Sequence, residues 1–403
     1  MSLKEKINTL AKENFQWVKQ IREHLHANPE LSFVEFETSE YIVKHLLELG
    51  LEVETKIVKT GIVATLKCKN PTKKTVALRA DMDALPIQET NNVNYKSCKA
   101  GIMHACGHDV HSASLLGVAK IFTTLKDELE GTIKFIFQPG EEKLPGGAKL
   151  MIDDGILERH KPDIIIAQHV TPQIPTGKVG FKSGIFMAST DEIYIEVIGT
   201  GGHAAMPNLY NNPLLIAAEL LLKLNTVFDD NNLHVIQEKN TVIPTVLAFG
   251  KIVGNGATNV IPDKVNVEGT FRTFDENWRE KAHQIITKIC NEIEVRNKCE
   301  ITCNIIIGYP FLTNNKTVTN QSKYSATAYL GIENIIDLDY RMTAEDFAYF
   351  SQKLPACFYR IGTGNAAKNI TSNVHTSTFD IDENSLEIMT GLMAYIAAEH
   401  LMN

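Results

Sequence analysis

The sequence has little of what nucleic-acid-binding proteins require. Its 403 residues contain 40 Lys and Arg against 48 Asp and Glu, a net charge of −8, and basic residues form no tract. Binding to nucleic acid through phosphate neutralisation needs a basic surface. The charge balance therefore argues against a nucleic-acid partner.

Long apolar runs are also missing, and cysteines are few. No apolar run approaches the roughly 20 residues needed to span a bilayer. The first thirty residues are charged and lack the apolar core of a signal peptide. Seven scattered cysteines, an odd number, are typical of a reduced chain rather than a disulfide framework. We therefore expect a soluble, cytoplasmic protein.

Strand-like and helix-like segments alternate in the first half of the chain. Short runs at 75–80, 132–137 and 163–167 are rich in apolar and β-branched residues, and a helical pattern covers 111–129. Runs that are apolar on both sides are typical of a mostly parallel sheet covered by helices. The pattern predicts an α/β fold.

The middle of the chain follows a different order of elements. The predicted segments are strand 192–197, helix 213–227, strands 245–253 and 264–271, helix 275–296 and strand 300–307. This β-α-β-β-α-β order is that of a ferredoxin-like unit. We therefore predict one α/β domain, formed by 1–187 and 308–403, that is interrupted by an α+β insert, 188–307.

Side chains able to bind metals follow four predicted strands of the α/β domain. They are Asp81 and Asp83, Glu141 and Glu142, His169, and His375 in a polar loop after strand 357–362. Because ligands of a parallel sheet gather at the carboxyl ends of its strands, these side chains should lie close together.

Cys106 and His108 belong to the densest cluster of candidate ligands. In an extended backbone, residues two apart face the same side, and Gly107 between them would allow a tight approach. A buried free cysteine beside surface histidines is the alternative, and it is favoured when the pair is taken alone. The other strand ends shift the preference to a metal site, whereas His104 and His111 suit supporting positions better.

The neighbouring carboxylates Glu141 and Glu142 could divide two tasks. One could bind a metal while the other takes a proton from a metal-bound water, although a solvated acidic turn is the common alternative. Asp83, with Asp81, could bind a hard metal, orient a histidine ligand or cap a turn. His169 could also be an ordinary core histidine.

The full ligand set, one Cys, three His and one Glu, indicates the kind of metal. Such ligands suit borderline ions such as Zn²⁺, Mn²⁺, Co²⁺ or Ni²⁺ rather than Mg²⁺ or Ca²⁺. Five ligands exceed one tetrahedral site, so the set predicts two metals.

Seven motifs in fixed order resemble those of the aminoacylase and carboxypeptidase-type co-catalytic metallohydrolases. They are HANPEL (26–31), LRADMDALPI (78–87), MHACGHD (103–109), FQPGEE (137–142), GTGGHAA (199–205), AEDFAYF (344–350) and HTSTFD (375–380). The chain is most similar to the branch with hippurate hydrolase, N-acetyl-diaminopimelate deacetylase and plant auxin-conjugate hydrolases. The resemblance covers nearly the whole chain.

This resemblance implies a zinc-peptidase-like fold in which the insert is a lid and dimerisation domain. Two divalent ions, Mn²⁺ or Zn²⁺ with Co²⁺ or Ni²⁺ as alternatives, would be held by Cys106, His108, Glu142, His169 and His375. The Cys106 thiolate would bridge the ions, Glu141 would be the general base, and Asp83 would orient a ligand.

The resemblance also implies substrate-binding residues on the insert. His203 would approach the scissile carbonyl, in cis or from the partner of a homodimer, and Asn259 and Arg272 would grip a substrate carboxylate. Without the resemblance, a plain turn at His203 and a surface charge at Arg272 would be preferred. The lid departs from the family pattern at Asn208, usually His, and at Asn212, usually Asp, which leaves substrate preference open.

The reaction implied is hydrolysis of the amide bond of an N-acyl-amino acid. A dipeptidase or aminopeptidase with the same centre is the alternative enzyme. A non-catalytic binding protein that kept the fold is a third reading, which metal analysis would distinguish.

Overall fold

The chain forms two units in the computed structural model. The described residues are 1–229, 235–236, 241–242 and 244–402. The first unit comprises Met1–Phe186, Thr313–Asp339 and Asp346–Asn403, and the second comprises Met187–Leu312 and Tyr340–Glu345. The short segment Tyr340–Glu345 thus groups with the second unit, whereas the sequence placed it in the α/β domain.

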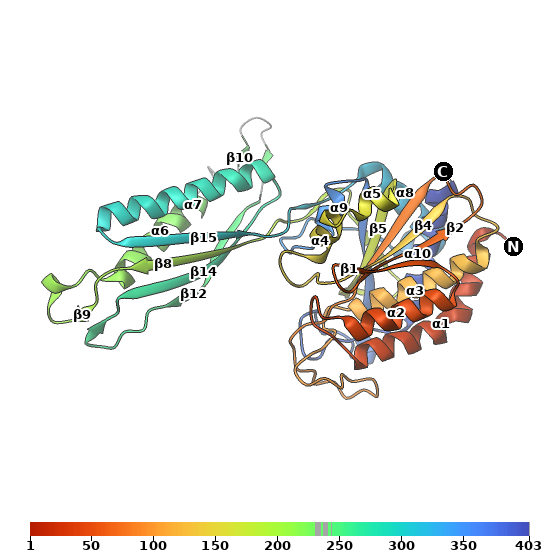
Figure 1. Cartoon of the computed structure of the whole chain (residues 1–403), viewed down its shortest axis with the longest axis horizontal. Helices are drawn as coiled ribbons and strands as arrows, with labels where there is room; N and C mark the ends of the chain where they lie inside the picture. Colours follow the sequence, from red (N-terminus) through yellow and green to blue (C-terminus); the bar gives the residue numbers. More distant parts are fainter. Residues whose placement is uncertain (230–234, 237–240, 243, 403) are drawn as a thin grey trace. The chain divides into compact units, whose positions relative to one another are not determined.

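An eight-stranded sheet organises the first unit (Figure 1). Its order is β1-β2-β4-β3-β5-β18-β6-β17, and the strands β4, β3, β5 and β18 run parallel to their neighbours in this central part. The bounds are β1 Glu52–Ile57, β2 Gly61–Lys67, β3 Thr75–Asp81, β4 Thr132–Gln138, β5 Ile164–Pro175, β6 Val179–Phe181, β17 Ile335–Asp337 and β18 Ala356–Gly364. This arrangement confirms the predicted α/β fold with a mostly parallel sheet.

Helices of the first unit pack on the sheet and on one another, and α1, α3, α8 and α10 share one apolar core with the central strands (Figure 1). The bounds are α1 Leu3–Ala27, α2 Phe36–Glu48, α3 His108–Leu125, α4 Gly147–Asp153, α5 Ile156–His160, α8 Lys316–Leu330, α9 Ala348–Ser351 and α10 Asn384–Met402. Ser2 caps α1 by accepting the N–H of Glu5, and apolar residues at helical spacing, Ile7, Ala11 and Val18, are buried. Among the described residues, no helix is both long and apolar enough to cross a membrane.

The second unit contains a four-stranded antiparallel sheet of order β12-β14-β8-β15. The bounds are β8 Asp191–Ile198, β9 Gly202–His203, α6 Pro213–Asp229, β12 Val246–Val253, β13 Val260–Ile261, β14 Lys264–Arg272, α7 Glu276–Asn297 and β15 Glu300–Ile307. Along the chain these elements read β8-α6-β12-β14-α7-β15, and α6 and α7 cover the sheet with an apolar core of their own. This is the topology of a ferredoxin-like unit.

Elements α5, α9, β6, β9, β13 and β17 were not predicted, and neither were the remaining short elements. They are the strands β7 Gly184–Met187, β10 Val235–Ile236, β11 Thr241–Val242 and β16 Leu312–Asn314, and the 3-10 turns Pro207–Leu209, Ile332–Asn334 and Ala366–Lys368. Such short segments carry too few residues for a periodic pattern to stand out.

Two long elements differ from their predicted bounds in ways that matter for the site. Helix α3 begins at His108 rather than near residue 111, because Gly107 has a φ of 84° and starts the helix with a left-handed turn. Strand β5 continues to Pro175, so His169 lies within the strand and not beyond its end.

Candidate metal centre

Cys106 and His108 are brought together by a turn and not by an extended backbone. Cys106 precedes the left-handed Gly107, and His108 is the first residue of α3. A Cβ atom at Gly107 would lie 2.5 Å from a methyl group of Val170, so only glycine fits between the two side chains. The predicted pairing is therefore present, but its predicted cause, alternation along a strand, is wrong.

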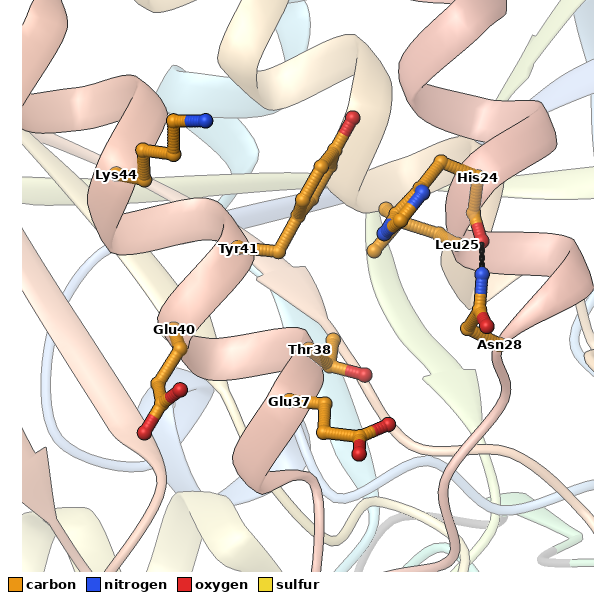
Figure 2. A pocket seen from close by; sticks show the side chains of 8 residues that line it. All are labelled: His24, Leu25, Asn28, Glu37, Thr38, Glu40, Tyr41 and Lys44. Atoms are coloured by element: carbon orange, nitrogen blue, oxygen red, sulfur yellow. Dashed lines mark hydrogen bonds between the residues drawn. The ribbon is translucent and has the colours of Figure 1, made fainter.

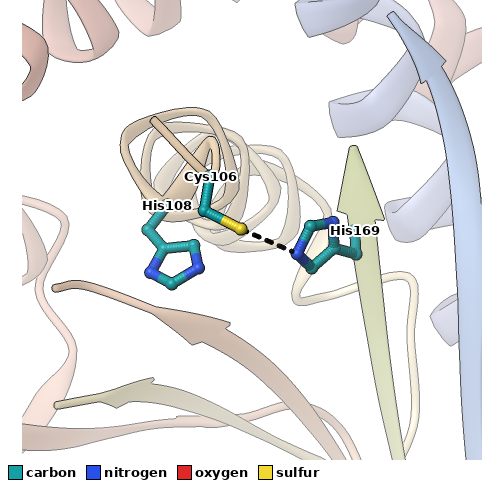
Figure 3. A group of neighbouring side chains, drawn as sticks. All are labelled: Cys106, His108 and His169. Atoms are coloured by element: carbon teal, nitrogen blue, oxygen red, sulfur yellow. Dashed lines mark hydrogen bonds between the residues drawn. The ribbon is translucent and has the colours of Figure 1, made fainter. Parts of the chain in front are cut away.

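One group of candidate ligands consists of Cys106, His108 and His169 (Figure 3). All three side chains are buried, and their ligand atoms lie within 4.8 Å of one another. The Cys106 Sγ atom is 3.5 Å from Nε2 of His169. Because Nδ1 of His169 donates to the Val170 carbonyl at 2.8 Å, Nε2 keeps its lone pair facing the cysteine.

A second group shares the same cysteine and consists of Cys106, Glu142 and His375. Oε1 of Glu142 is 3.1 Å from Nε2 of His375 and 4.0 Å from Nε2 of His108. The two groups share one sulfur atom, so the donors present in this region fit two metal ions.

Asp83 orients two of these ligand residues through hydrogen bonds. Its Oδ1 atom is 3.1 Å from Nδ1 of His108, and its Oδ2 atom accepts the backbone N–H of Glu142 at 2.9 Å and the hydroxyl of Ser32 at 2.7 Å. With its proton on Nδ1, His108 directs the lone pair of Nε2 toward the centre. In the described part of the chain, Nε2 has no hydrogen-bond partner although it is buried.

His111 and Asp81 lie beside the centre, yet their atoms are already engaged. Nδ1 of His111 donates to Asp81 at 2.6 Å, and Nε2 accepts the N–H of Val170 at 3.0 Å. Asp81 also accepts from Nη1 of Arg79 at 2.6 Å. His111 therefore ties β3 to β5 next to His169 and has no lone pair left for a metal.

The charges around the centre fit a divalent cation. Burial opposes the charge of His108, but Asp81, Asp83 and Glu142 outweigh it and raise the pKa of this histidine to about 10. Burial, together with Glu142 and other nearby carboxylates, raises the pKa of the Cys106 thiol well above its usual value. The field of these carboxylates thus favours positive charge, and a cation is what would allow the thiolate to form.

Glu141 lies next to both ligand groups. It is buried, and its carboxylate shares a group of ligand-competent atoms with His108 and Glu142. Oε1 accepts the backbone N–H of Asp346 at 3.3 Å. This contact fixes one oxygen of a carboxylate that adjoins the centre.

The insert residues predicted to bind substrate lie in the second unit and are more open. His203 in β9 pairs with Val260 in β13, next to Asn259, and both His203 and Asn259 are exposed. Nδ1 of His203 accepts the N–H of Ala205 at 3.1 Å, so Nε2 carries the proton and can donate. Arg272 is half-buried and donates to the Met342 carbonyl at 3.0 Å.

These insert residues do not converge within one chain. Arg272 ends β14, whereas β9 and β13 adjoin the opposite end of that strand, which begins at Lys264. Nine residues in a strand span about 25 Å. His203 and Asn259 therefore form one pair, and Arg272 stands apart from it.

Two further residues, which no motif in the sequence indicates, support the ligand segments. Glu35 is buried, and its Oε1 atom accepts the N–H of Gly140, just before Glu141, at 2.8 Å. Arg22 donates to Asp109, which follows His108, at 2.9 Å. A buried charge inside an otherwise amphipathic helix is the signal that could have identified Arg22.

A separate hollow lies between α1 and α2 (Figure 2). It has a volume of about 470 Å³, and the rings of His24 and Tyr41 stack there with centroids 3.9 Å apart. The hollow shares no residue with the candidate ligand groups, so we do not include it in the site.

Comparisons with known proteins place the chain among metallohydrolases. The profile of Peptidase family M20/M25/M40 matches residues 77–399. Thermostable carboxypeptidase 2 of Saccharolobus solfataricus is 36% identical over 96% of each chain, and N-acetyl-L-cysteine deacetylase of Bacillus subtilis is 36% identical over 95% of this chain and 88% of its own. The crystal structure of Bacillus subtilis YXEP protein, a dinuclear metal binding peptidase from the M20 family, covers 97% of this chain and 99% of its own with a TM-score of 0.81 at 30% identity. This chain therefore belongs to peptidase family M20/M25/M40.

Proposed function

We propose that the protein hydrolyses the amide bond of N-acyl-amino acids with the help of two divalent metal ions. The observation that carries this proposal is the pair of ligand groups that share Cys106, with the carboxylate of Glu141 beside them. The deacetylase activity in the name of one relative supports the substrate class, and the dinuclear centre of a similar structure supports the number of ions.

The ligand roles follow from the two groups. Cys106, His108 and His169 would hold one ion, and Cys106, Glu142 and His375 would hold the other. When bound, the ions would polarise the acyl carbonyl and make a water molecule more acidic. The mixed set of thiolate, imidazole and carboxylate ligands suits Mn²⁺ or Zn²⁺, with Co²⁺ or Ni²⁺ as alternatives.

Glu141 acts as the general base in this proposal. It takes a proton from the attacking water, whose oxygen forms a bond with the acyl carbon, and passes the proton to the amine nitrogen as the C–N bond breaks. The backbone N–H of Asp346 donates to Oε1 of Glu141, and this hydrogen bond fixes the orientation of the Glu141 carboxylate. The products are a carboxylate and a free amino acid.

The second unit would serve as a lid that binds the substrate. The Nε2 proton of His203 would stabilise the oxyanion that develops on the carbonyl, and Arg272 and Asn259 would bind the carboxylate of the amino acid. Because Arg272 lies far along β14 from His203 and Asn259, we propose a homodimer in which His203 and Asn259 serve the partner's centre. A cytoplasmic location, expected from the seven free cysteines, belongs to the same proposal.

A peptidase that acts on unblocked peptides is the second candidate, favoured by the relative named as a carboxypeptidase. Both reactions would use the same centre, so substrate comparison is the test. The Mn²⁺-loaded enzyme is assayed with N-acetyl-, N-benzoyl- and longer N-acyl-amino acids and with free dipeptides. We expect the largest kcat/KM for an N-acyl-amino acid. Faster hydrolysis of free dipeptides would favour the peptidase, and fewer than one bound ion per chain without hydrolysis would favour a binding protein.

A further inference from the structure

The loop that carries His375 is the least buried part of the candidate centre. The His375 side chain is 52% exposed, whereas Cys106, His108 and His169 are buried. The φ of His375 is 63°, a left-handed conformation that is unfavourable for a residue with a Cβ atom. A loop that presents a ligand in this conformation must be held firmly on both sides of the ligand.

The beginning of this loop is tied to the segment that precedes Cys106. The N–H of His375 donates to the carbonyl of Ala105 at 2.7 Å. Two residues later, the carbonyl of Ser377 accepts the N–H of Thr90 at 2.9 Å. These bonds set where the loop starts but leave its far end to other contacts.

The far end is held by a charged side chain that is shielded from water. Arg22 in α1 is 0% exposed and donates from Nη2 to Oδ1 of Asp380 at 2.8 Å. The hydroxyl of Tyr95 donates to Oδ2 of the same carboxylate at 3.0 Å, and its ring centroid lies 4.5 Å from Cζ of Arg22. Asp380, only 19% exposed, is therefore fixed from both of its oxygens.

Arg22 joins this loop to the segment of another ligand. Its Nε atom donates to Asp109, the residue after His108, at 2.9 Å. Nδ1 of His26 contacts the same carboxylate at 2.8 Å. Burial opposes the charge of Arg22, but Asp109 and Asp380 outweigh it and raise the pKa of the guanidinium. Losing one carboxylate would leave a buried charge poorly compensated.

We propose that Arg22 and Asp380 are positioning residues for one of the two ions, the one assigned to Cys106, Glu142 and His375. The inference rests on the proposed function, because it assumes that two ions bind. Neither residue is a ligand; their ion pair keeps the loop in the position where Nε2 of His375 lies 3.1 Å from Glu142. Without the pair, the strained loop would relax and this ion would bind more weakly, while the ion of His108 and His169 would remain.

Metal binding tests the proposal without any activity assay. Equilibrium dialysis with Mn²⁺ should give two ions for the wild type, and for Asp380→Ala one tight ion and a second weakened by about ten- to a hundredfold. His375→Ala, which removes the ligand itself, should give the same pattern. Glu383→Ala is the matched control, because Glu383 lies three residues after Asp380 and also pairs with a basic residue of α1. Nζ of Lys19 is 2.7 Å from Oε2 of Glu383, and this ion pair is more exposed than that of Arg22 and Asp380. This control should keep both ions.

Milder variants separate positioning from a general loss of structure. Asp380→Asn keeps an oxygen for Arg22 but loses the negative charge, so it should restore only part of the affinity for the second ion. Tyr95→Phe, which removes one hydrogen bond to Asp380, should weaken that affinity by a few-fold. Wild-type affinity for both ions in Asp380→Ala would overturn the proposal, as would parallel loss of both ions. If Asp380→Ala does not fold, an unchanged affinity of Tyr95→Phe for the second ion would overturn the proposal instead. A wild type that binds two ions but cleaves no N-acyl-amino acid would refute the proposed function and leave this inference intact.

Discussion

The two units of the chain hold their candidate functional residues in opposite ways. In the first unit, the ligands Cys106, His108 and His169 are buried and supported by further hydrogen bonds. In the second unit, His203 and Asn259 are exposed. The first unit therefore has a preorganised centre, whereas the second presents polar side chains that are open to solvent.

This difference indicates which part of the proposed reaction each unit can control. Metal binding and proton transfer depend on distances that the first unit sets by itself, such as 3.1 Å between Asp83 and His108. The oxyanion stabilisation proposed for His203 would come from a side chain that is exposed in the second unit. Variants of the ligands and of the residues that orient them should therefore change metal content, whereas variants of His203 in the second unit should change turnover with the metals in place.

The largest effect is expected from Cys106→Ala. Because both ligand groups share this sulfur, the variant should lose both ions and nearly all activity. Metal content after dialysis measures the loss, and Cys98→Ala, at an exposed cysteine, is the control that should bind two ions. Retention of two ions by Cys106→Ala would show that the sulfur does not bridge them.

His203→Ala should lower kcat by about 10²- to 10³-fold while both ions remain, because only an oxyanion donor is lost. If His203 serves the partner's centre, mixing this variant with Glu141→Gln and allowing subunits to exchange should restore activity. In a random mixture, half of the dimers are mixed and each has one complete site, so about a quarter of wild-type activity is expected. No recovery after confirmed subunit exchange would place His203 in cis.

Asp83→Asn should weaken metal affinity by about ten- to a hundredfold, since the residue orients a ligand without binding an ion. An amide nitrogen in place of Oδ2 would face the N–H of Glu142, or the amide would turn and lose the bond to His108. Titration with Mn²⁺ measures the change. Ser32→Ala removes a single neutral donor and should change the affinity less; an equal loss in both variants would contradict the orienting role.

The last expected effect is on stability and concerns the loop that precedes Glu141. Burial, with the nearby charge of Asp83, raises the pKa of Glu35 to about 7. The folded chain thus holds this proton more tightly than the unfolded chain, so the stability it contributes is complete below pH 4.5 and is lost as the pH rises through about 7. Glu35→Gln cannot titrate there and should be more stable relative to wild type at pH 8 than at pH 5, by at most about 3 kcal/mol.

Unfolding of the metal-free protein by denaturant at the two pH values checks the Glu35 prediction. Glu40→Gln, at an exposed position of α2, which begins one residue after Glu35, is the control that should follow the pH dependence of the wild type. An identical pH dependence for Glu35→Gln and wild type would rule out a titration of Glu35 in this range.

The fold was predictable because its main elements are long and strongly patterned. Strand β3 is buried along nearly its whole length, and the predicted run 75–80 matches it to within one residue. The start of α3 and the extension of β5 were not predicted, because the first depends on a left-handed glycine and the second on pairing with β18. The family indicated by the motifs is confirmed by the profile match.

For the site, ligand chemistry and the order of the motifs allowed the candidate ligands to be predicted, but not the residues around them. The sequence named the residues that the structure gathers around Cys106, but not the side chains that hold them. Arg22 and Asp380 lie 358 positions apart in the chain, and no local pattern joins them. For His203 and Arg272 the roles remain predictions, because they depend on a lid and a partner.

In the proposed function, a two-metal centre in the first unit works with Glu141 as its general base. The most direct test compares metal content and turnover of an N-acetyl-amino acid in wild type and Glu141→Gln. We expect Glu141→Gln to bind two ions, as the wild type should, while its turnover falls by about 10²- to 10⁴-fold, the usual contribution of a general base. Two bound ions with near-normal turnover in Glu141→Gln would contradict the account.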